Sequence, residues 1–147
     1  MNTPSDFVSA WRRLAVKRRV GLGPLMGSRG DEFAVALAAA SLAVPPGTSL
    51  SEREVNERLV AWLAGPGAML ATDHVELRRW LVDLGFLERD GYGREYRRVA
   101  PPVAYAAAVA ALAAIDAGAL AEAARVELAR DRAERRARHE ARGGAAR

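Results

Sequence analysis

The sequence predicts a mainly α-helical protein with one small β-hairpin, a helix near the N-terminus and a long C-terminal helix. Alanine supplies 32 of the 147 residues and aromatic residues only 6%, so helix formers greatly outnumber typical strand residues. Apolar residues recur at helical spacing in several segments that glycine and proline separate. Strand-favouring residues gather in one segment, residues 86–99. A chain of this length can bury a sizeable core as one domain.

The N-terminal segment, residues 1–30, is predicted to be a basic amphipathic helix followed by a glycine-rich linker. The helix is expected over residues 5–19, with Ser5 or Asp6 as its cap. A helix this short is marginal in isolation, so we expect it to dock on the body or to be partly disordered. Residues 21–30 contain no phosphate-binding pattern and are predicted to be a hinge. The apolar stripe of the helix consists of Phe7, Trp11, Leu14 and Ala15.

Three helices are predicted in the first part of residues 31–100. The first spans Asp31–Val44 and ends at a Pro-Pro-Gly sequence. The second begins at Ser51, where a glutamate three residues later completes a capping box. The third begins after Asp73 and ends at Gly85, a residue suited to a left-handed C-terminal cap. The residues predicted to face the core are Phe33, Leu37, Ala40 and Leu42 in the first helix, Val55, Leu59, Trp62 and Leu63 in the second, and Leu77, Trp80, Leu81 and Leu84 in the third.

A β-hairpin is predicted directly after the third helix. Phe86 and Leu87 indicate a short strand and Glu95–Val99 a returning strand, because aromatic and β-branched residues favour sheets. The glycine-containing stretch 89–94 between them predicts the turn.

Residues 101–147 are predicted to form one long Ala/Arg-rich helix that reaches about Arg142. Pro101 and Pro102 separate it from the hairpin, and large apolar residues nearly vanish after Leu128. The end of this helix is therefore expected to be solvated. Its inner face is predicted to hold Val103, Ala106, Val109, Leu112, Ala113 and Leu120.

The predicted order of three helices and a hairpin is that of a winged helix-turn-helix, in which the third helix enters the DNA major groove. The same region contains four motifs in order, which are Ser51–Glu57, Asp73–Leu87, Arg89–Gly91 and Gly93–Tyr96. On these motifs it resembles the domain of unknown function 2087 over about residues 48–99. This resemblance implies a transcription-related setting, because similar proteins combine the domain with a repressor-type helix-turn-helix, and it implies no established activity. The linker Ala64–Ala71 departs from the family pattern because it is apolar and glycine-rich.

Five arginines of this region are the candidate nucleic-acid contacts. A guanidinium group binds phosphates and guanine edges bidentately. Against DNA contact, residues 48–99 hold eight arginines and nine acids, and the acids crowd the helix starts, where they complement the helix dipole. The alternative is a solvated helix face on which these arginines pair with neighbouring acids. The candidates are Arg78 and Arg79 on the third helix and Arg94, Arg97 and Arg98 on the hairpin.

The net charge of +4 belongs to the two ends of the chain. Residues 1–20 hold five basic residues and one acidic residue, and residues 125–147 hold eight basic and four acidic residues. Residues 21–124, in contrast, hold nine basic and thirteen acidic residues.

The leading hypothesis is a non-enzymatic DNA-binding protein of transcriptional regulation, with DNA favoured over RNA. The alternative is a protein-interaction or scaffold subunit that uses the C-terminal helix and the basic ends. An RNA-containing complex is one setting for such a subunit. The C-terminal helix also offers a seam for a homodimer.

No residue pattern predicts an enzyme, a cofactor or a metal site. The chain has no cysteine, which excludes disulfides, thiol catalysis and thiolate zinc sites. The two histidines, His74 and His139, are predicted to be helix-surface residues, and no serine lies in a nucleophile-elbow pattern. No apolar run is long enough for a membrane span and no signal pattern opens the sequence, so we expect a cytoplasmic protein.

Overall fold

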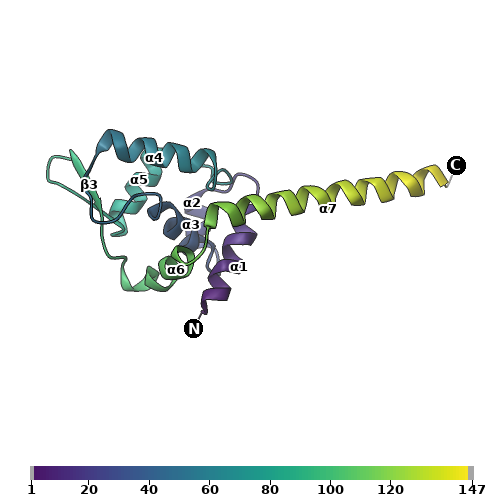
Figure 1. The fold of residues 1–147 in the computed structure, drawn as a ribbon, viewed down its shortest axis with the longest axis horizontal. Helices are drawn as coiled ribbons and strands as arrows, with labels where there is room; N and C mark the ends of the chain where they lie inside the picture. Colours follow the sequence, from purple (N-terminus) through teal and green to yellow (C-terminus); the bar gives the residue numbers. More distant parts are fainter. Residues whose placement is uncertain (1, 146–147) are drawn as a thin grey trace.

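The computed structural model describes residues 2–145, which are mainly helical with one small antiparallel sheet and a long C-terminal helix, as the sequence predicts (Figure 1). The sheet lies at one end of the body, and the C-terminal helix leaves the body at the other. The elements in chain order are α1 (Pro4–Ala15), α2 (Leu22–Gly27), α3 (Glu32–Ser41), β1 (Leu50–Ser51), α4 (Glu52–Ala64), α5 (His74–Asp83), β2 (Leu87–Arg89), β3 (Glu95–Arg98), α6 (Val103–Ala113) and α7 (Ala117–Ala145).

Helix α1 docks on the body through its apolar stripe, which is buried as predicted. The indole Nε1 of Trp11 donates a hydrogen bond to the carbonyl oxygen of Ala117, 2.8 Å away. The predicted cap, Ser5 or Asp6, is wrong because Thr3 caps the helix. The Thr3 hydroxyl accepts from the Asp6 amide and the Asp6 carboxylate accepts from the Thr3 amide, which forms a capping box. The helix also ends earlier than predicted, at Ala15.

The glycine-rich stretch 21–30 is not simply a hinge, because α2 forms within it and buries Leu22 and Leu25. Just before it, Val20 is tied to the loop between α4 and α5. The Val20 amide donates to the Met69 carbonyl and the Ala71 amide donates to the Val20 carbonyl, each at 2.8 Å. The connection between α1 and α3 is therefore fixed along much of its length.

Residues 31–99 contain the three predicted helices and the hairpin, together with a strand that was not predicted. The caps at Ser51 and Asp73 form as expected, and Gly85 ends α5 with φ +89°. Strand β1 pairs with β3 so that Leu50 lies opposite Tyr96, and β2 pairs with the other side of β3. The result is a three-stranded antiparallel sheet with the order β1-β3-β2.

One continuous core joins the N-terminal, central and C-terminal parts, because α1, α3 and α6 pack against one another. Aromatic rings link α3 to α5 and α6 to the residue before β2. The ring centroids of Phe33 and Trp80 lie 5.5 Å apart in an edge-to-face contact, and those of Phe86 and Tyr105 lie 5.1 Å apart. The sheet and α5 are thereby held in place relative to the helical layer.

The prediction of a single helix through residues 101–147 is wrong, because the chain turns between α6 and α7. The two helix axes are bent by 72°. Asp116 starts the second helix: its carboxylate accepts from the Ala119 amide at 2.9 Å. The predicted inner face of α6 is also partly wrong, since Val103 is 95% exposed. The buried residues of α6 are Ala108, Ala111 and Leu112.

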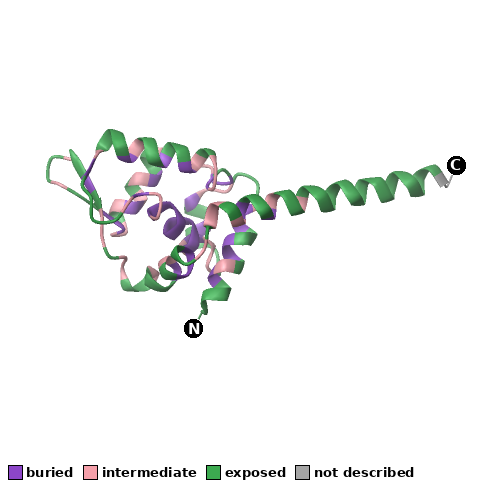
Figure 2. Ribbon diagram, viewed as in Figure 1, coloured by how far each residue is buried: buried purple, intermediate pink, exposed green. Residues whose placement is uncertain are grey.

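Helix α7 has an anchored first part and a projecting second part. Ala121 and Ala124 are buried against the body, whereas residues 129–144 are exposed along their whole length (Figure 2). No single helix within residues 2–145 is both long and apolar enough to cross a membrane. Helices α6 and α7 together meet the criteria of length and composition but are sharply bent at their junction.

Candidate nucleic-acid interface

The side chain of Arg78 extends from α5 to α4 and the sheet rather than into solvent. Its Nη1 lies 3.1 Å from a carboxylate oxygen of Glu52 and donates a hydrogen bond to the side-chain oxygen of Asn56. The guanidinium also lies over the ring of Tyr96, 5.4 Å from the centroid. With only 16% of its side chain exposed, Arg78 first of all fastens α5 to α4 and β3.

A small hollow beside Arg78 gathers three arginines from two elements. It has a volume of about 250 Å³ and lies between α5 and the hairpin. Arg78 and Arg79 reach it from α5, and Arg89 reaches it from the end of β2, while Asp83 is the one acid on its wall. Arg79 is exposed, so its guanidinium is accessible to a ligand. This hollow is the most basic part of the surface that α5 and the hairpin share.

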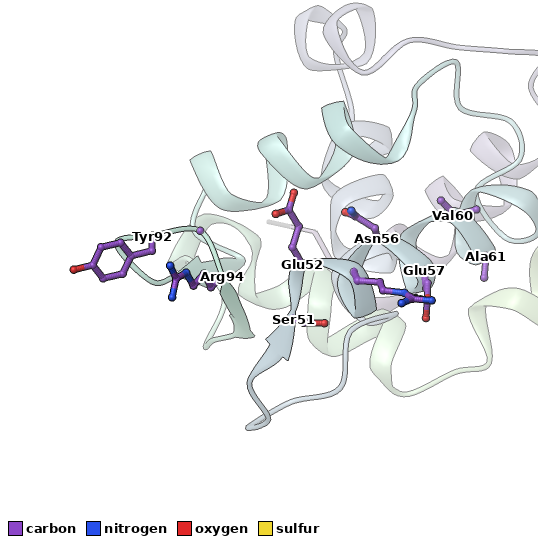
Figure 3. A pocket seen from close by; sticks show the side chains of 10 residues that line it. Ser51, Glu52, Asn56, Glu57, Val60, Ala61, Tyr92 and Arg94 are labelled. Atoms are coloured by element: carbon purple, nitrogen blue, oxygen red, sulfur yellow. Dashed lines mark hydrogen bonds and ion pairs between the residues drawn. The ribbon is translucent and has the colours of Figure 1, made fainter.

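A shallow groove of about 840 Å³ lies on the other side of Arg78, between α4 and the tip of the hairpin. Figure 3 shows Asn56 and Val60 along α4 and Tyr92 at the hairpin tip, where its ring points away from α4. Tyr92 is 84% exposed, and the guanidinium of Arg94 lies 5.5 Å from its ring centroid. Arg53 on the groove wall is paired with Glu57, so little unpaired charge faces this groove apart from Arg94.

The remaining two candidate arginines lie in β3 and have protein partners. Arg97 is exposed and pairs across the hairpin with Glu88 at 3.3 Å. Arg98 donates from Nη1 to the carbonyl oxygen of Val44 at 2.9 Å, and burial lowers the pKa of Arg98. Arg98 thus ties the sheet to the segment that follows α3. The structure brings Arg78 and Arg79 together and separates them from Arg94, Arg97 and Arg98.

The turn of the hairpin is ordered by one carboxylate. Asp90 accepts a hydrogen bond from the Arg94 amide at 2.7 Å and a longer one from the Glu95 amide. The hydrogen bond from the Arg94 backbone holds the pKa of Asp90 below its ordinary value. This turn fixes the position of Tyr92 and Arg94 at the hairpin tip.

Arg89 was missed because the sequence places it in a turn, where an arginine has no special meaning. Its proximity to α5 depends on the pairing of β2 with β3. Within residues 2–145, no group of three or more His, Asp or Glu side chains is placed to hold a metal ion.

The comparisons with known proteins give one match. The family model described as an uncharacterized protein conserved in bacteria (DUF2087) matches residues 28–98. No curated protein and no solved structure matches the chain significantly. The matched segment begins before α3 and ends with β3, so it adds α3 to the region of the resemblance, residues 48–99. Residues 28–98, just under half of the chain, are therefore similar to the DUF2087 family.

Proposed function

We propose that this protein binds DNA as a winged-helix-like regulator of transcription, with α5 as the groove-reading helix and the β2–β3 hairpin as the wing. Two aspects of the architecture support this proposal. α5 is the third helix of the α3, α4, α5 series, and the hairpin follows it directly. β1 completes a small sheet behind the hairpin, so the wing has a firm base.

The basic hollow between α5 and the hairpin carries the proposal. It concentrates three guanidinium groups and one carboxylate in a region whose overall charge is slightly negative. Arg79 and Arg89 would bind phosphates or base edges, because their guanidinium forks match both geometries. Arg78 would act mainly through α5, whose position it fixes.

The hairpin arginines take different parts in this proposal. Arg94 at the wing tip would contact the flanking phosphate backbone, with Tyr92 beside it. Arg97 would join only if its pair with Glu88 opens. Arg98 would support the sheet instead, because its guanidinium already binds the Val44 carbonyl.

The test removes the two accessible arginines of the hollow. We expect Arg79→Ala combined with Arg89→Ala to weaken binding to a random-sequence duplex DNA about tenfold at low salt. The slope of log affinity against log salt should fall by about 2, because two phosphate contacts are lost. The matched control, Arg29→Ala combined with Arg58→Ala, removes the same charge from exposed positions outside the hollow. Equal binding by the two double variants would overturn the proposal.

A second candidate function is that of a protein-interaction or scaffold subunit. Exposed Val60, Val75 and Tyr92 favour it, since they give the α4, α5 and hairpin side several apolar points. The projecting part of α7, with half-exposed Val126 at its base, offers the seam for a homodimer. Sedimentation of the full chain and of a chain ending at Leu128 tests this role: a dimer lost on truncation supports it, and a monomer in both cases removes the homodimer from consideration.

A further inference from the structure

The two basic ends of the chain meet in space at a groove that lies apart from α5 and the hairpin. The groove has a volume of about 460 Å³ and runs between the end of α1 and the first part of α7. Arg18 and Arg19 line one side together with Lys17, whose Nζ pairs with Glu32 at 2.7 Å, and Arg132 lines the other. Its floor is small and apolar, made by Ala68, Met69, Leu128 and Ala129.

The α7 wall of this groove is firmly anchored. Arg125 donates to three carbonyl oxygens, those of Ala15, Gly65 and Pro66, at distances of 2.9, 3.0 and 2.9 Å. These carbonyls lie at the end of α1 and just after α4, so one guanidinium joins three helices. Because Arg125 is committed to this role, it orients α7, which is exposed along residues 129–144.

The groove continues as a basic stripe along the projecting part of α7. Leu128 and Arg132 lie on the face of α7 that lines the groove. With about 3.6 residues per turn, three further arginines and one histidine follow on the same face. Of the acids of α7, Asp131 lies at the edge of this stripe, one turn before Arg135, and the others fall outside it. Glu127 is paired with Arg12 at 3.2 Å. Among the described residues, none from 128 to 144 takes part in a salt bridge. The continuing stripe consists of Arg135, Arg136, His139 and Arg142.

We propose that this groove and stripe, together called the α1–α7 basic track, bind the sugar-phosphate backbone of duplex DNA without regard to sequence. The track spans about 25 Å from Arg125 to Arg142, at 1.5 Å per residue. Exposed arginines spaced along such a length suit a regular line of phosphates. This surface is separate from the basic hollow between α5 and the hairpin, so it adds a second contact with DNA.

Three features favour duplex DNA over other polyanionic partners. The projecting part of α7 is exposed on all sides, and a helix about 10–12 Å wide fits the DNA major groove, which is about 12 Å wide. The major groove of A-form RNA is too deep and narrow to admit it. No large apolar side chain follows Leu128 in α7, so this part of the helix has nothing to insert into a lipid surface.

The decisive experiment compares two faces of the same helix. Arg132→Gln with Arg136→Gln removes two charges from the track, and Arg130→Gln with Arg138→Gln removes two charges from the opposite face. Both pairs change the net charge equally and lie in the same exposed stretch. We expect the track pair to weaken binding to a random-sequence 20-base-pair duplex about tenfold and to lower the salt slope by about 2. The opposite-face pair should change affinity less than threefold.

A phase variant tests the geometry without changing any charge. One extra alanine after Leu128 turns the outer stripe by about 100° relative to the groove, at about 3.6 residues per turn. We expect this insertion to weaken DNA binding although composition and charge are kept. Circular dichroism of each variant should show the parent's helix content.

Equal effects of the two glutamine pairs, or unchanged binding by the insertion variant, would overturn the track. Equal affinity for duplex RNA of the same sequence would overturn the fit of α7 to the DNA major groove. The proposed function can fail separately, because loss of Arg79 and Arg89 leaves the track unchanged, and glutamine at Arg132 and Arg136 leaves the hollow unchanged.

Discussion

The two arginine-rich sides of the molecule use the same side chain in opposite ways. On the α5 and hairpin side, Arg78, Arg97 and Arg98 bind protein partners, namely Glu52, Glu88 and the Val44 carbonyl. On the α1 and α7 side, Arg12 and Arg13 pair with Glu127 and Glu32, and Arg125 binds three carbonyl oxygens. The arginines from 130 to 142, in contrast, take part in no salt bridge within residues 2–145. The net charge of a sequence segment therefore does not show which of its charged side chains are available to a ligand. Burial and partners decide which arginines remain open to a ligand.

The largest expected effect concerns the apolar base on which α5 rests. Leu81 is fully buried, so Leu81→Ala should lower the free energy of unfolding by about 2 to 5 kcal/mol. Urea denaturation measures it. Val75→Ala on the same helix is the control, because Val75 is 41% exposed and its loss should cost less than about 0.5 kcal/mol. Similar costs for the two variants would mean that the burial of α5 is misassigned.

The next effect tests whether Arg125 is a structural residue. Arg125→Ala removes hydrogen bonds to three carbonyls, and we expect a loss of about 2 to 4 kcal/mol in the free energy of unfolding. Lysine should restore only part of this loss, because an ammonium cannot reach the carbonyls with a planar fork. Arg130→Ala, one exposed arginine further along α7, should be close to neutral. If Arg125→Ala were equally neutral, the three hydrogen bonds of Arg125 would not anchor α7.

A smaller effect separates the adjacent arginines of α5. Arg78→Ala should cost about 1 to 2 kcal/mol, because it removes the contacts with Glu52, Asn56 and Tyr96. Arg79→Ala should leave the midpoint of thermal unfolding nearly unchanged, since Arg79 is exposed. A larger loss for Arg79 than for Arg78 would reverse the roles assigned to them.

The smallest effect is on the hairpin turn and depends on pH. The pKa of Asp90 is lower in the fold than its ordinary value of 3.8 because the Arg94 amide stabilises the carboxylate. Its contribution to stability is therefore present above pH 3.8 and is lost as pH falls through the lower folded pKa. Carboxyl chemical shifts of Asp90 in an NMR titration measure the folded pKa directly. Asp90→Asn should remove this dependence while Asp6, at the other end of the molecule, keeps its own titration.

Local signals allowed much of the fold to be predicted. The caps at Ser51 and Asp73, the left-handed glycine at Gly85 and the apolar stripes of α4 and α5 all depend on residues within a few positions of one another. β1 was missed because it has two residues and its partner strand lies about 45 residues later. Such pairing has no local signature.

The C-terminal region was harder to predict because alanine-rich sequence carries little periodicity. No proline or glycine marks the end of α6, and Asp116 could equally have been a surface residue of one long helix. The apolar linker Ala64–Ala71 has a structural role that also depends on distant segments. Its carbonyls bind Arg125, and Gly67 lies so close to the Trp62 ring that a Cβ there would come within 2.3 Å of a ring carbon.

The candidate site was predictable in its residue types and not in its grouping. Arg78 and Arg79 are neighbours in sequence, yet only the contacts with Glu52 and Asn56 distinguish a fastening residue from an accessible one. Arg98 is less available to a ligand than the sequence suggests, and Arg89 is more available. Both differences follow from the pairing of β3, which places Arg98 beside Val44 and Arg89 near α5.

The anchored start and bare end of α7 make it a lever arm. From Leu128 to Ala145 the helix extends about 25 Å beyond its last support, at 1.5 Å per residue. A tilt of about 10° at Arg125 would therefore move the far end by about 4 Å, with no change inside the helix. A small rearrangement of the loop that holds Arg125 therefore produces a larger displacement at the C-terminal end of α7. The position of that end depends on the three carbonyl groups that bind Arg125.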